Sequence, residues 1–359
     1  EFRRVLFRSK IMKKGFALVM ASMMALSLTA CGGNGSSATT AADTSAADTK
    51  AEGTTAAAPA DKIGLAGSGK ELIFTTGGDQ GTYYGFGSVL AGQISDMTDT
   101  TVTAIVGKGS KGNIEAMDAG DAQLGFVQSD VMAYAYNGTN LFDGAKVDGF
   151  STVAALYMEQ VQIVTLNPDI KTVADLKGKT VSVGDSGSGV YFNALDCLGA
   201  YGLTIDDITP TYQSFGDSVE AMQDGKIDAA FIVAGAPTTA VTSLAATRKV
   251  YLVELDDEHI DKLIEASPYY SKYTIAKDAY GLDADATTVA VGAVVVARDD
   301  VDENDIYNVV AGIYDSIDTL GHDKKNELDL DFAASVTAVP YHKGAAKYFA
   351  EKGLTVPTK

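Results

Sequence analysis

The stretch LIFTTGGDQGTYYGFGSVLAGQI, residues 72–94, decides the fold. Its first residues, Leu72–Thr76, form an apolar run that is typical of a buried strand. The glycine-rich segment Gly77–Thr82 predicts a loop, and apolar residues at helical spacing from Tyr83 onwards predict a helix. A strand, a glycine-rich loop and a helix in this order point free backbone N–H groups at an anionic or carbonyl ligand.

Four further predicted strands are followed by loops of small and polar residues. The strands are Thr101–Val106, Leu124–Val127, Thr180–Val183 and Ala229–Val233, and their loops are Gly107–Ser110, Gln128–Asp130, Gly184–Gly189 and Ala234–Thr238. Alternating strands and helices predict an α/β fold with mostly parallel sheets covered by helices. Ligands of such sheets bind beyond the carboxyl ends of the strands, so we expect the five loops to border the site.

Two long apolar runs predict connections between two lobes. Residues 153–166 and 289–298 are each long enough to cross from one lobe to the other. Lobe one is then residues 69–167 together with 289–359, and lobe two is residues 168–288. A lobe built from two chain segments is typical of a hinge that closes on a ligand in the cleft.

The first 68 residues contain a predicted export signal and tether. Residues 1–11 lack a hydrophobic period and are interpreted as a cloning or assembly scar. Residues 12–30 combine two lysines, a short apolar run and a small-residue cleavage site, which is the pattern of a signal peptide. The tetrad Leu28-Thr29-Ala30-Cys31 resembles the lipobox of bacterial lipoproteins, in which the cysteine is acylated; the alternative is an ordinary signal with an incidental cysteine. Residues 31–68 are rich in Ala, Thr, Ser and Gly and predict a flexible tether.

The charge of the exported part limits its partners. Residues 31–359 carry 22 Lys+Arg against 46 Asp+Glu, a net charge of −24. Such a surface repels nucleic acid and anionic lipid headgroups. If Cys31 is acylated, Cys197 has no disulfide partner, and its apolar helical context predicts a buried small side chain. The three histidines are far apart in sequence, so we expect neither a metal site nor a cofactor.

The order of several short motifs resembles the TAXI subgroup of TRAP-transporter solute receptors. The similarity covers residues 70–353 and rests on Thr76–Tyr84, Gln128–Asp130 with Ala135–Thr139, Val173–Gly184 with Gly187–Gly189, Gly225–Ala229 with Val233–Pro237, and Pro340–Phe349. The resemblance implies a type II periplasmic-binding-protein fold, no enzymatic activity, and delivery of a small organic acid or amino acid, glutamate-like or another carboxylate, to a TRAP permease driven by an ion gradient.

The resemblance also implies where the ligand lies. The residues expected to face the cleft are Gly81, Thr82, Tyr83, Tyr84, Ser110, Gln128, Ser129, Gly187, Ser188, Gly189, Ala234 and Gly235. Lys108 departs from the family pattern and adds a candidate cation, although a solvated loop lysine explains it equally well. Because adjacent residues cannot share one helix face, one of Tyr83 and Tyr84 is expected to pack in the core and the other to reach the cleft.

The remaining charged residues leave alternatives open. Arg248 and Arg298 are interpreted as surface residues, so loop N–H groups, hydroxyls, and Lys108 or Lys111 are expected to hold a ligand carboxylate. Asp130 either complements a helix dipole or contacts a ligand. The leading hypothesis is a lipid-anchored extracytoplasmic receptor that works with a permease. A ligand-sensing lipoprotein with a signalling partner, and an exported enzyme on the same fold, are the alternatives.

Overall fold

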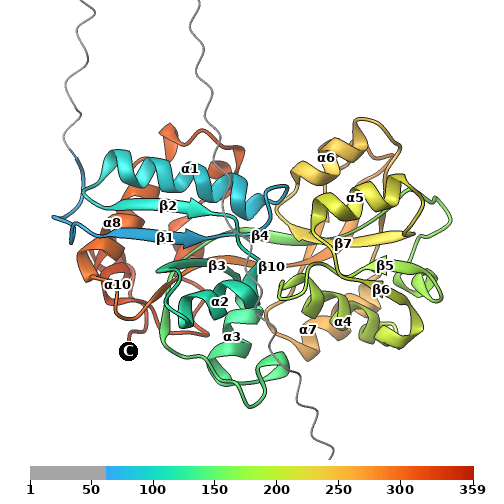
Figure 1. The fold of residues 1–359 in the computed structure, drawn as a ribbon, viewed down its shortest axis with the longest axis horizontal. Coiled ribbons are helices and arrows are strands. Elements are labelled where there is room, and N and C mark those ends of the chain that lie inside the picture. The colour runs from blue at the N-terminus through green and yellow to red at the C-terminus, as the bar shows by residue number, and fades with distance from the viewer. Residues whose placement is uncertain (1–61) are drawn as a thin grey trace, which may run out of the picture. The chain divides into compact units, whose positions relative to one another are not determined.

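The computed structural model describes residues 62–359, in which ten strands form one sheet (Figure 1). The strands are β1 Glu71–Thr75, β2 Thr101–Ile105, β3 Leu124–Gln128, β4 Phe150–Thr165, β5 Thr180–Ser182, β6 Thr209–Thr211, β7 Ala229–Ala234, β8 Tyr251–Val253, β9 Ser271–Ile275 and β10 Ala286–Arg298. The helices are α1 Thr82–Met97, α2 Ser110–Asp118, α3 Ser129–Asn137, α4 Val190–Ala200, α5 Phe215–Gln223, α6 Thr239–Ala245, α7 Asp257–Ala266, α8 Glu303–Tyr314, α9 Leu330–Ala333 and α10 Lys343–Glu351.

The sheet has two halves with the same strand order. The first half reads β2-β1-β3-β10 and the second half reads β6-β5-β7-β4. The first three strands of each half are parallel, whereas β10 is antiparallel to β3 and β4 is antiparallel to β7. This repeated order, with the fourth strand antiparallel, confirms the predicted α/β type II periplasmic-binding-protein fold. The sheet as a whole is mixed, because both connecting strands run against their neighbours.

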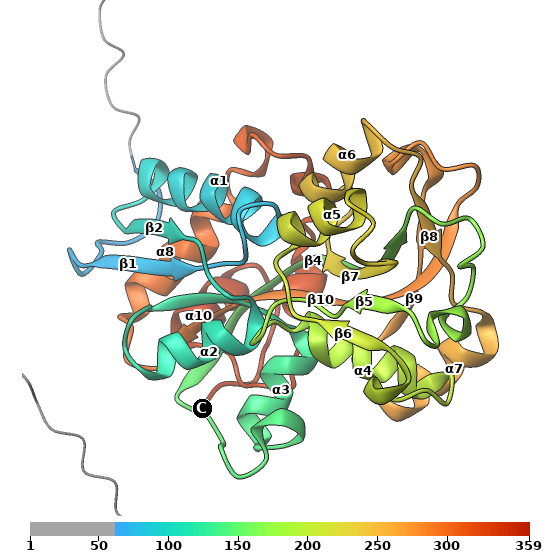
Figure 2. The same cartoon turned by 45° about the vertical axis from the view of Figure 1, so that its right-hand side comes forward.

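The strands β4 and β10 connect the two halves. They pair with each other from Ala290 opposite Gln160 to Arg298 opposite Phe150, with two register shifts. Nearly every residue of both strands is buried, as expected for strands covered on both faces. They correspond to the two apolar runs of the sequence, and each begins three residues earlier than predicted. Figure 2 shows them running side by side through the middle of the sheet.

Helices cover both faces of the sheet. Helices α1, α5 and α6 lie on one face, and α2, α3, α4 and α7 lie on the other (Figures 1 and 2). Successive side chains of β7 point to opposite faces of the sheet, so this strand packs against both layers of helices. Phe231 and Val233 pack with α4 and α7, whereas Ala230 and Ile232 pack with α5 and α6. Cys197 of α4 is fully buried, as predicted.

The folded chain begins earlier than the sequence suggested. Residues 63–68 were assigned to the tether, but the Ile63 N–H donates to the Met97 carbonyl at 2.8 Å, and the Leu65 N–H donates to Asn308 Oδ1 at 2.7 Å. These hydrogen bonds attach the segment to α1 and α8, so the predicted tether limit of residue 68 is wrong. The scar, the signal peptide, Cys31 and the rest of the tether lie outside the described residues.

No helix within residues 62–359 combines the length and apolar character needed to cross a membrane.

Candidate ligand-binding site

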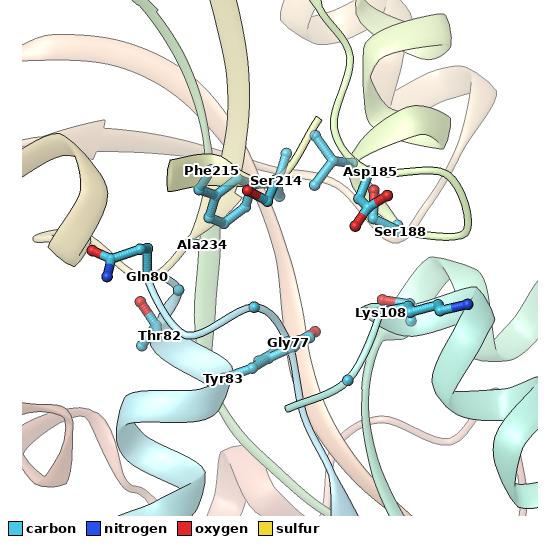
Figure 3. Close-up of a pocket in the computed structure, with 18 of the residues that line it drawn as sticks. Gly77, Gln80, Thr82, Tyr83, Lys108, Asp185, Ser188, Ser214, Phe215 and Ala234 are labelled. Carbon is cyan, nitrogen blue, oxygen red and sulfur yellow. The ribbon is translucent and has the colours of Figure 1, made fainter. Parts of the chain in front are cut away.

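A pocket lies between the two halves of the sheet, at the carboxyl ends of its parallel strands. Loops from both halves border it, and residues of the first half face those of the second across the cavity (Figure 3). The lining residues are Gly77–Tyr83, Gly107–Ser110, Gln128, Glu159, Asp185, Ser188–Val190, Ser214–Gly216, Val233 and Ala234. The five loops marked in the sequence all contribute, as strand-end loops of an α/β sheet should.

Nine of the thirteen expected ligand residues line this pocket. They are Gly81, Thr82, Tyr83, Lys108, Ser110, Gln128, Ser188, Gly189 and Ala234. The other four, Tyr84, Ser129, Gly187 and Gly235, lie just outside it. Three of them support the walls: Ser129 Oγ accepts from the Gly292 N–H, the Gly187 carbonyl from the Gly112 N–H, and the Gly235 carbonyl from the Thr82 hydroxyl.

The N-termini of three helices converge on the pocket without side-chain caps. Gly81, Gly109 and Gly189 are the N-cap residues of α1, α2 and α4 and line the pocket. Glycine has no side chain to accept a hydrogen bond from the first turn, so that turn keeps free N–H groups. Among the hydrogen bonds of the described residues none involves the N–H of Thr82, Ser110 or Val190, the first residues of these helices. Such N–H groups form an anion-binding surface.

Three buried polar atoms of the pocket lack a hydrogen-bond partner in the described chain. They are the Tyr83 hydroxyl, Gln128 Oε1 and the Ser188 hydroxyl. Buried polar side chains are almost always hydrogen-bonded, so each exception asks for an explanation. Three such atoms in one pocket call for partners from outside the chain, either a ligand or ordered water.

Tyr83 both packs in the core and reaches the pocket. Its ring stacks on the Phe126 ring, with the ring centroids 4.6 Å apart and an angle of 2° between the ring planes. Tyr83 is 7% exposed. Tyr84 is partly exposed and does not line the pocket. The prediction that the two tyrosines divide these roles is therefore wrong. Burial raises the pKa of the Tyr83 hydroxyl well above its usual value, so this group stays protonated.

Charged residues occupy the floor and the rim of the pocket. Glu159 of β4 is buried at the floor, where burial raises the pKa of its carboxyl to about 8. Asp79 and Asp185 are exposed at the rim. Lys108 is exposed as well, and its ammonium points away from Tyr83 and Phe215 (Figure 3). Lys111 pairs with Glu115 on the surface of α2 and does not line the pocket.

A buried hydrogen-bond network joins the pocket wall to the second half. Gln128 Nε2 donates to Asn193 Oδ1 at 2.9 Å, and Asn193 Nδ2 donates to Asp130 at 3.1 Å and to the Tyr270 hydroxyl at 2.8 Å. The Tyr270 hydroxyl in turn donates to Asp196 at 2.8 Å. Asp130 is fully buried, and burial raises its pKa to about 7. It does not line the pocket but supports the residues that do.

A protein-family model described as the NMT1-like family matches residues 74–353. The chain belongs to the NMT1-like family. A curated relative from Escherichia coli (strain K12), provisionally named as an aliphatic sulfonates-binding protein, is 43% identical over 70 residues. That match covers 20% of this chain and 22% of the relative, so it spans about a fifth of the length of either protein.

Solved structures of solute-binding proteins are also similar. The alkanesulfonate-binding protein SsuA of Xanthomonas axonopodis pv. citri, bound to MOPS, is 17% identical with a TM-score of 0.45; the match covers 78% of this chain and 83% of that protein. PhnD1 of Prochlorococcus marinus (MIT 9301), in complex with methylphosphonate, is 13% identical with a TM-score of 0.46, over 73% of this chain and 89% of that protein. These likenesses are too loose to carry an inference about the ligand.

The family match corrects the resemblance drawn from the sequence. The TAXI assignment is wrong, because the family that covers residues 74–353 is NMT1-like and the curated relative is named for sulfonates. The misleading motifs are short and glycine-rich, such as Gly187–Gly189. Strand-end loops that bring backbone N–H groups to a ligand need glycine in many binding proteins, so these motifs reflect a shared fold more than a shared family. The TRAP permease was expected only from that resemblance, so this prediction is withdrawn as well.

Two parts of the pocket carry no loop signal in the sequence and were not expected there. Glu159 lies inside a strand and not in a loop, yet it is the one charged residue between Phe150 and Thr165, which is the signal that could have marked it. Ser214 and Phe215 line the pocket from the start of α5, where Ser214 accepts a hydrogen bond from the Asp217 N–H. A serine before an apolar helical pattern is an N-cap signal.

The two arginines do not reach the site, as predicted. Arg298 pairs with Asp300 through two of its nitrogens, Nε at 2.9 Å and Nη2 at 2.7 Å. Arg248 is exposed beside β8. Within residues 62–359 no group of three His, Cys, Asp or Glu side chains is placed to hold a metal ion.

Proposed function

We propose that this member of the NMT1-like family is an extracytoplasmic solute-binding protein, which binds one small anionic solute and passes it to a membrane transporter. The observation that carries the proposal is the convergence of three uncapped helix N-termini and three unpartnered polar atoms on one pocket. Free N–H groups at helix N-termini favour an anion. The periplasmic-binding-protein fold supports the same function.

A carboxylate is the anionic group that we propose for the solute. Its two oxygens can accept from the free N–H groups of Thr82, Ser110 and Val190 and from the Tyr83 and Ser188 hydroxyls. Neither arginine of the folded chain lines the pocket, so backbone and hydroxyl donors carry the recognition. A sulfonate, for which the Escherichia coli relative is named, is the other anion that the binding experiment must include.

The solute is enclosed when the two halves come together. Contacts between the halves already surround the pocket: the Gly112 N–H donates to the Gly187 carbonyl at 2.9 Å, and the Thr82 hydroxyl donates to the Gly235 carbonyl at 2.8 Å. We take residues 69–167 with 289–359, together with the segment 63–68 that hydrogen-bonds to α1 and α8, as one lobe and residues 168–288 as the other. The strands β4 and β10 then form the hinge, and these contacts break when the cleft opens.

Binding, not catalysis, is the role that the pocket chemistry favours. The lining residues include the hydroxyls of Ser110, Ser188 and Ser214 but no histidine or cysteine. A serine nucleophile needs a neighbouring base that removes its proton. Glu159 is the one buried carboxyl of the lining, and Tyr157 and the hydroxyl-bearing Tyr83, not a serine, are its neighbours.

Export and anchoring complete the proposal. Acylation of Cys31 would hold the receptor at the outer face of the cytoplasmic membrane, within reach of its transporter. Radiolabelled palmitate should enter the wild-type protein, and Cys31→Ala should abolish the label and release the protein from the membrane fraction. Equal labelling of both proteins would contradict the assignment of Cys31.

A calorimetric titration tests the solute-binding function. Protein that has been unfolded, dialysed and refolded to remove bound solute is titrated with a panel of carboxylates, amino acids and sulfonates. At least one should bind and raise the melting temperature through mass action. Ser188→Trp fills the pocket and should abolish binding, whereas Ser186→Trp, exposed in the same loop and outside the lining, should not. Folded protein that binds no member of the panel would contradict the proposal.

A further inference from the structure

Glu159 is a buried carboxyl without a neighbouring cation. It lies in the middle of β4, is 2% exposed, and lines the pocket. The Tyr157 hydroxyl donates to it at 3.2 Å, and the Tyr83 hydroxyl lies close enough to lower its pKa as well. None of the ion pairs among residues 62–359 includes it. A buried carboxylate with no counter-charge is costly, so Glu159 either holds a proton or receives a cation from the solute.

Lys324, the lysine that acts on Glu159, already has partners of its own. Lys324 belongs to the short helix η6 Asp323–Glu327, is 4% exposed, and lies over the Tyr157 ring at 5.3 Å from its centroid. Its ammonium donates to the Ala236 carbonyl at 2.9 Å and pairs with Glu327. Lys324 therefore lowers the pKa of Glu159 only from a distance, and the place beside the carboxyl inside the pocket is open to another cation.

Gln128 presents a second acceptor to the pocket, and its neighbours fix this orientation. Asn193 uses its amide nitrogen for Asp130 and Tyr270, so it turns its carbonyl oxygen towards Gln128. Gln128 must then donate its own amide nitrogen to Asn193, at 2.9 Å, which leaves Oε1 facing Gly189 and the cavity. This oxygen is buried and unpartnered. A carboxylate and an amide oxygen both accept hydrogen bonds, so each of these two positions calls for an N–H donor.

The opposite requirement holds at the helix N-termini, where the free groups are N–H donors. We infer that the pocket recognises a solute carrying both an acidic group and an amine, with Glu159 and Gln128 Oε1 accepting from the ammonium and the N-termini of α1, α2 and α4 holding the acid. The inference rests on the proposed solute-binding function and narrows its ligand to an amino acid or a related amino-substituted acid. Glu159 is then the residue that selects the amine.

The proton that Glu159 releases on solute binding is a second quantity that can be measured. Its titratable and charged neighbours are Tyr83 on α1, Tyr157 on β4, Asp130 on α3 and Lys324 on η6. In the empty pocket the pKa of about 8 leaves its carboxyl protonated at neutral pH. A bound ammonium stabilises the ionised form, so binding at pH 7 should release close to one proton.

Matched pairs of solutes test the amine requirement directly. Glutamate and glutarate, alanine and propionate, and taurine and ethanesulfonate differ only in the amine. In calorimetric titrations of solute-free protein at pH 7, the amine-bearing member of the pair that binds should bind about 10- to 100-fold more tightly, the range expected for a hydrogen bond to a charged group. Titrations in two buffers of different ionisation enthalpy should give close to one proton released per amine bound.

Glu159→Gln keeps the shape of the side chain and removes its charge. The variant should lose the preference for the amine and the proton release while still binding the deaminated acid. Glu265→Gln removes the same charge from an exposed position of α7 and should behave as wild type. Equal affinity for both members of each pair, or no proton release by the wild type, overturns the inference and leaves solute binding intact. If the folded protein binds other members of the panel but none of these amines, the inference is overturned and solute binding stands; if it binds no member of the panel, the inference fails with the proposed function.

Discussion

The Gln128 side chain of the first half is hydrogen-bonded to the Asn193 side chain of the second half, with 2.9 Å between Nε2 and Oδ1. This contact orders one wall of the pocket, because it turns Gln128 Oε1 towards the cavity. Asn193 also donates to Asp130 and to Tyr270. One amide of α4 therefore couples the closed arrangement of the two halves to the geometry of the pocket.

Asn193→Leu should destabilise the protein and weaken solute binding. The substitution leaves Gln128 Nε2 and Asp130 without their Asn193 partner and removes one of the two hydrogen bonds of the Tyr270 hydroxyl, at a cost of about 2–4 kcal/mol of unfolding free energy. Urea unfolding of the solute-free protein measures this loss. Asn326→Leu, an exposed position in η6, provides the control and should change the free energy by less than about 0.5 kcal/mol. An Asn193 variant as stable as wild type would show that the network contributes nothing.

Gly189→Ala should weaken solute binding more than it changes the stability of α4, the helix of which Gly189 is the N-cap. A Cβ atom at this position would overlap Gln128 Oε1, so the amide must move and lose its place in the network. We expect at least a ten-fold loss of affinity in calorimetry. Gly199→Ala, inside the same helix with nothing within 4 Å of the new atom, should instead stabilise the protein by about 0.5–1 kcal/mol. Similar behaviour of the two variants would contradict the close contact.

Tyr83→Phe should leave the empty protein stable and weaken binding. The ring keeps its stack on Phe126, and the hydroxyl that is lost has no partner in the empty pocket. Removing it therefore costs less than about 0.5 kcal/mol of stability, whereas a lost hydrogen bond to the solute should lower affinity about 5- to 30-fold. Thermal melting and calorimetry give the two values. A large drop in stability with unchanged affinity would mean that the hydroxyl serves the fold.

The stability of the solute-free protein should depend on pH through Glu159. Its pKa is about 8 in the folded protein and near 4.5 in the unfolded chain, so the folded state binds more protons between these values. Stability from this group is complete below about pH 4.5 and is lost as the pH rises through 8. Glu159→Gln cannot titrate, so its stability relative to wild type should rise with pH, by up to about 1.4 kcal/mol per unit, until about pH 8. Asp130 titrates in both proteins, so most of its contribution is common to the two curves. A difference independent of pH would refute the shift.

The sequence predicted the parts of the site that depend on local pattern. A strand followed by glycines and a helix start can be recognised in consecutive residues. This pattern predicts Gly81, Ser110 and Gly189 at the pocket, and all three line it. The α/β class and the two connecting strands follow from apolar runs such as 153–166. Each of these features is encoded within about twenty consecutive residues.

Features that depend on tertiary contacts were not predictable. Glu159 reaches the pocket because β4 lies between β10 and β7, where the two halves of the sheet meet, and its strand pattern does not reveal this position. Ser129 and Gly235 lie in the expected loops but not in the pocket lining, and they hydrogen-bond to Gly292 and Thr82 instead. The free carbonyl of Gln128 depends on Asn193, which is 65 residues away along the chain. Such pairings arise only when the halves are packed together.

A crystal structure of the protein with a solute retained through purification, or added from the panel above, tests the central claim most directly. We predict electron density between the two halves, with the acidic oxygens within about 3.0 Å of the N–H groups that begin α1, α2 and α4 and the amine beside Glu159. Density for the solute elsewhere, or an empty pocket at a saturating concentration of a solute that binds in solution, would contradict the account.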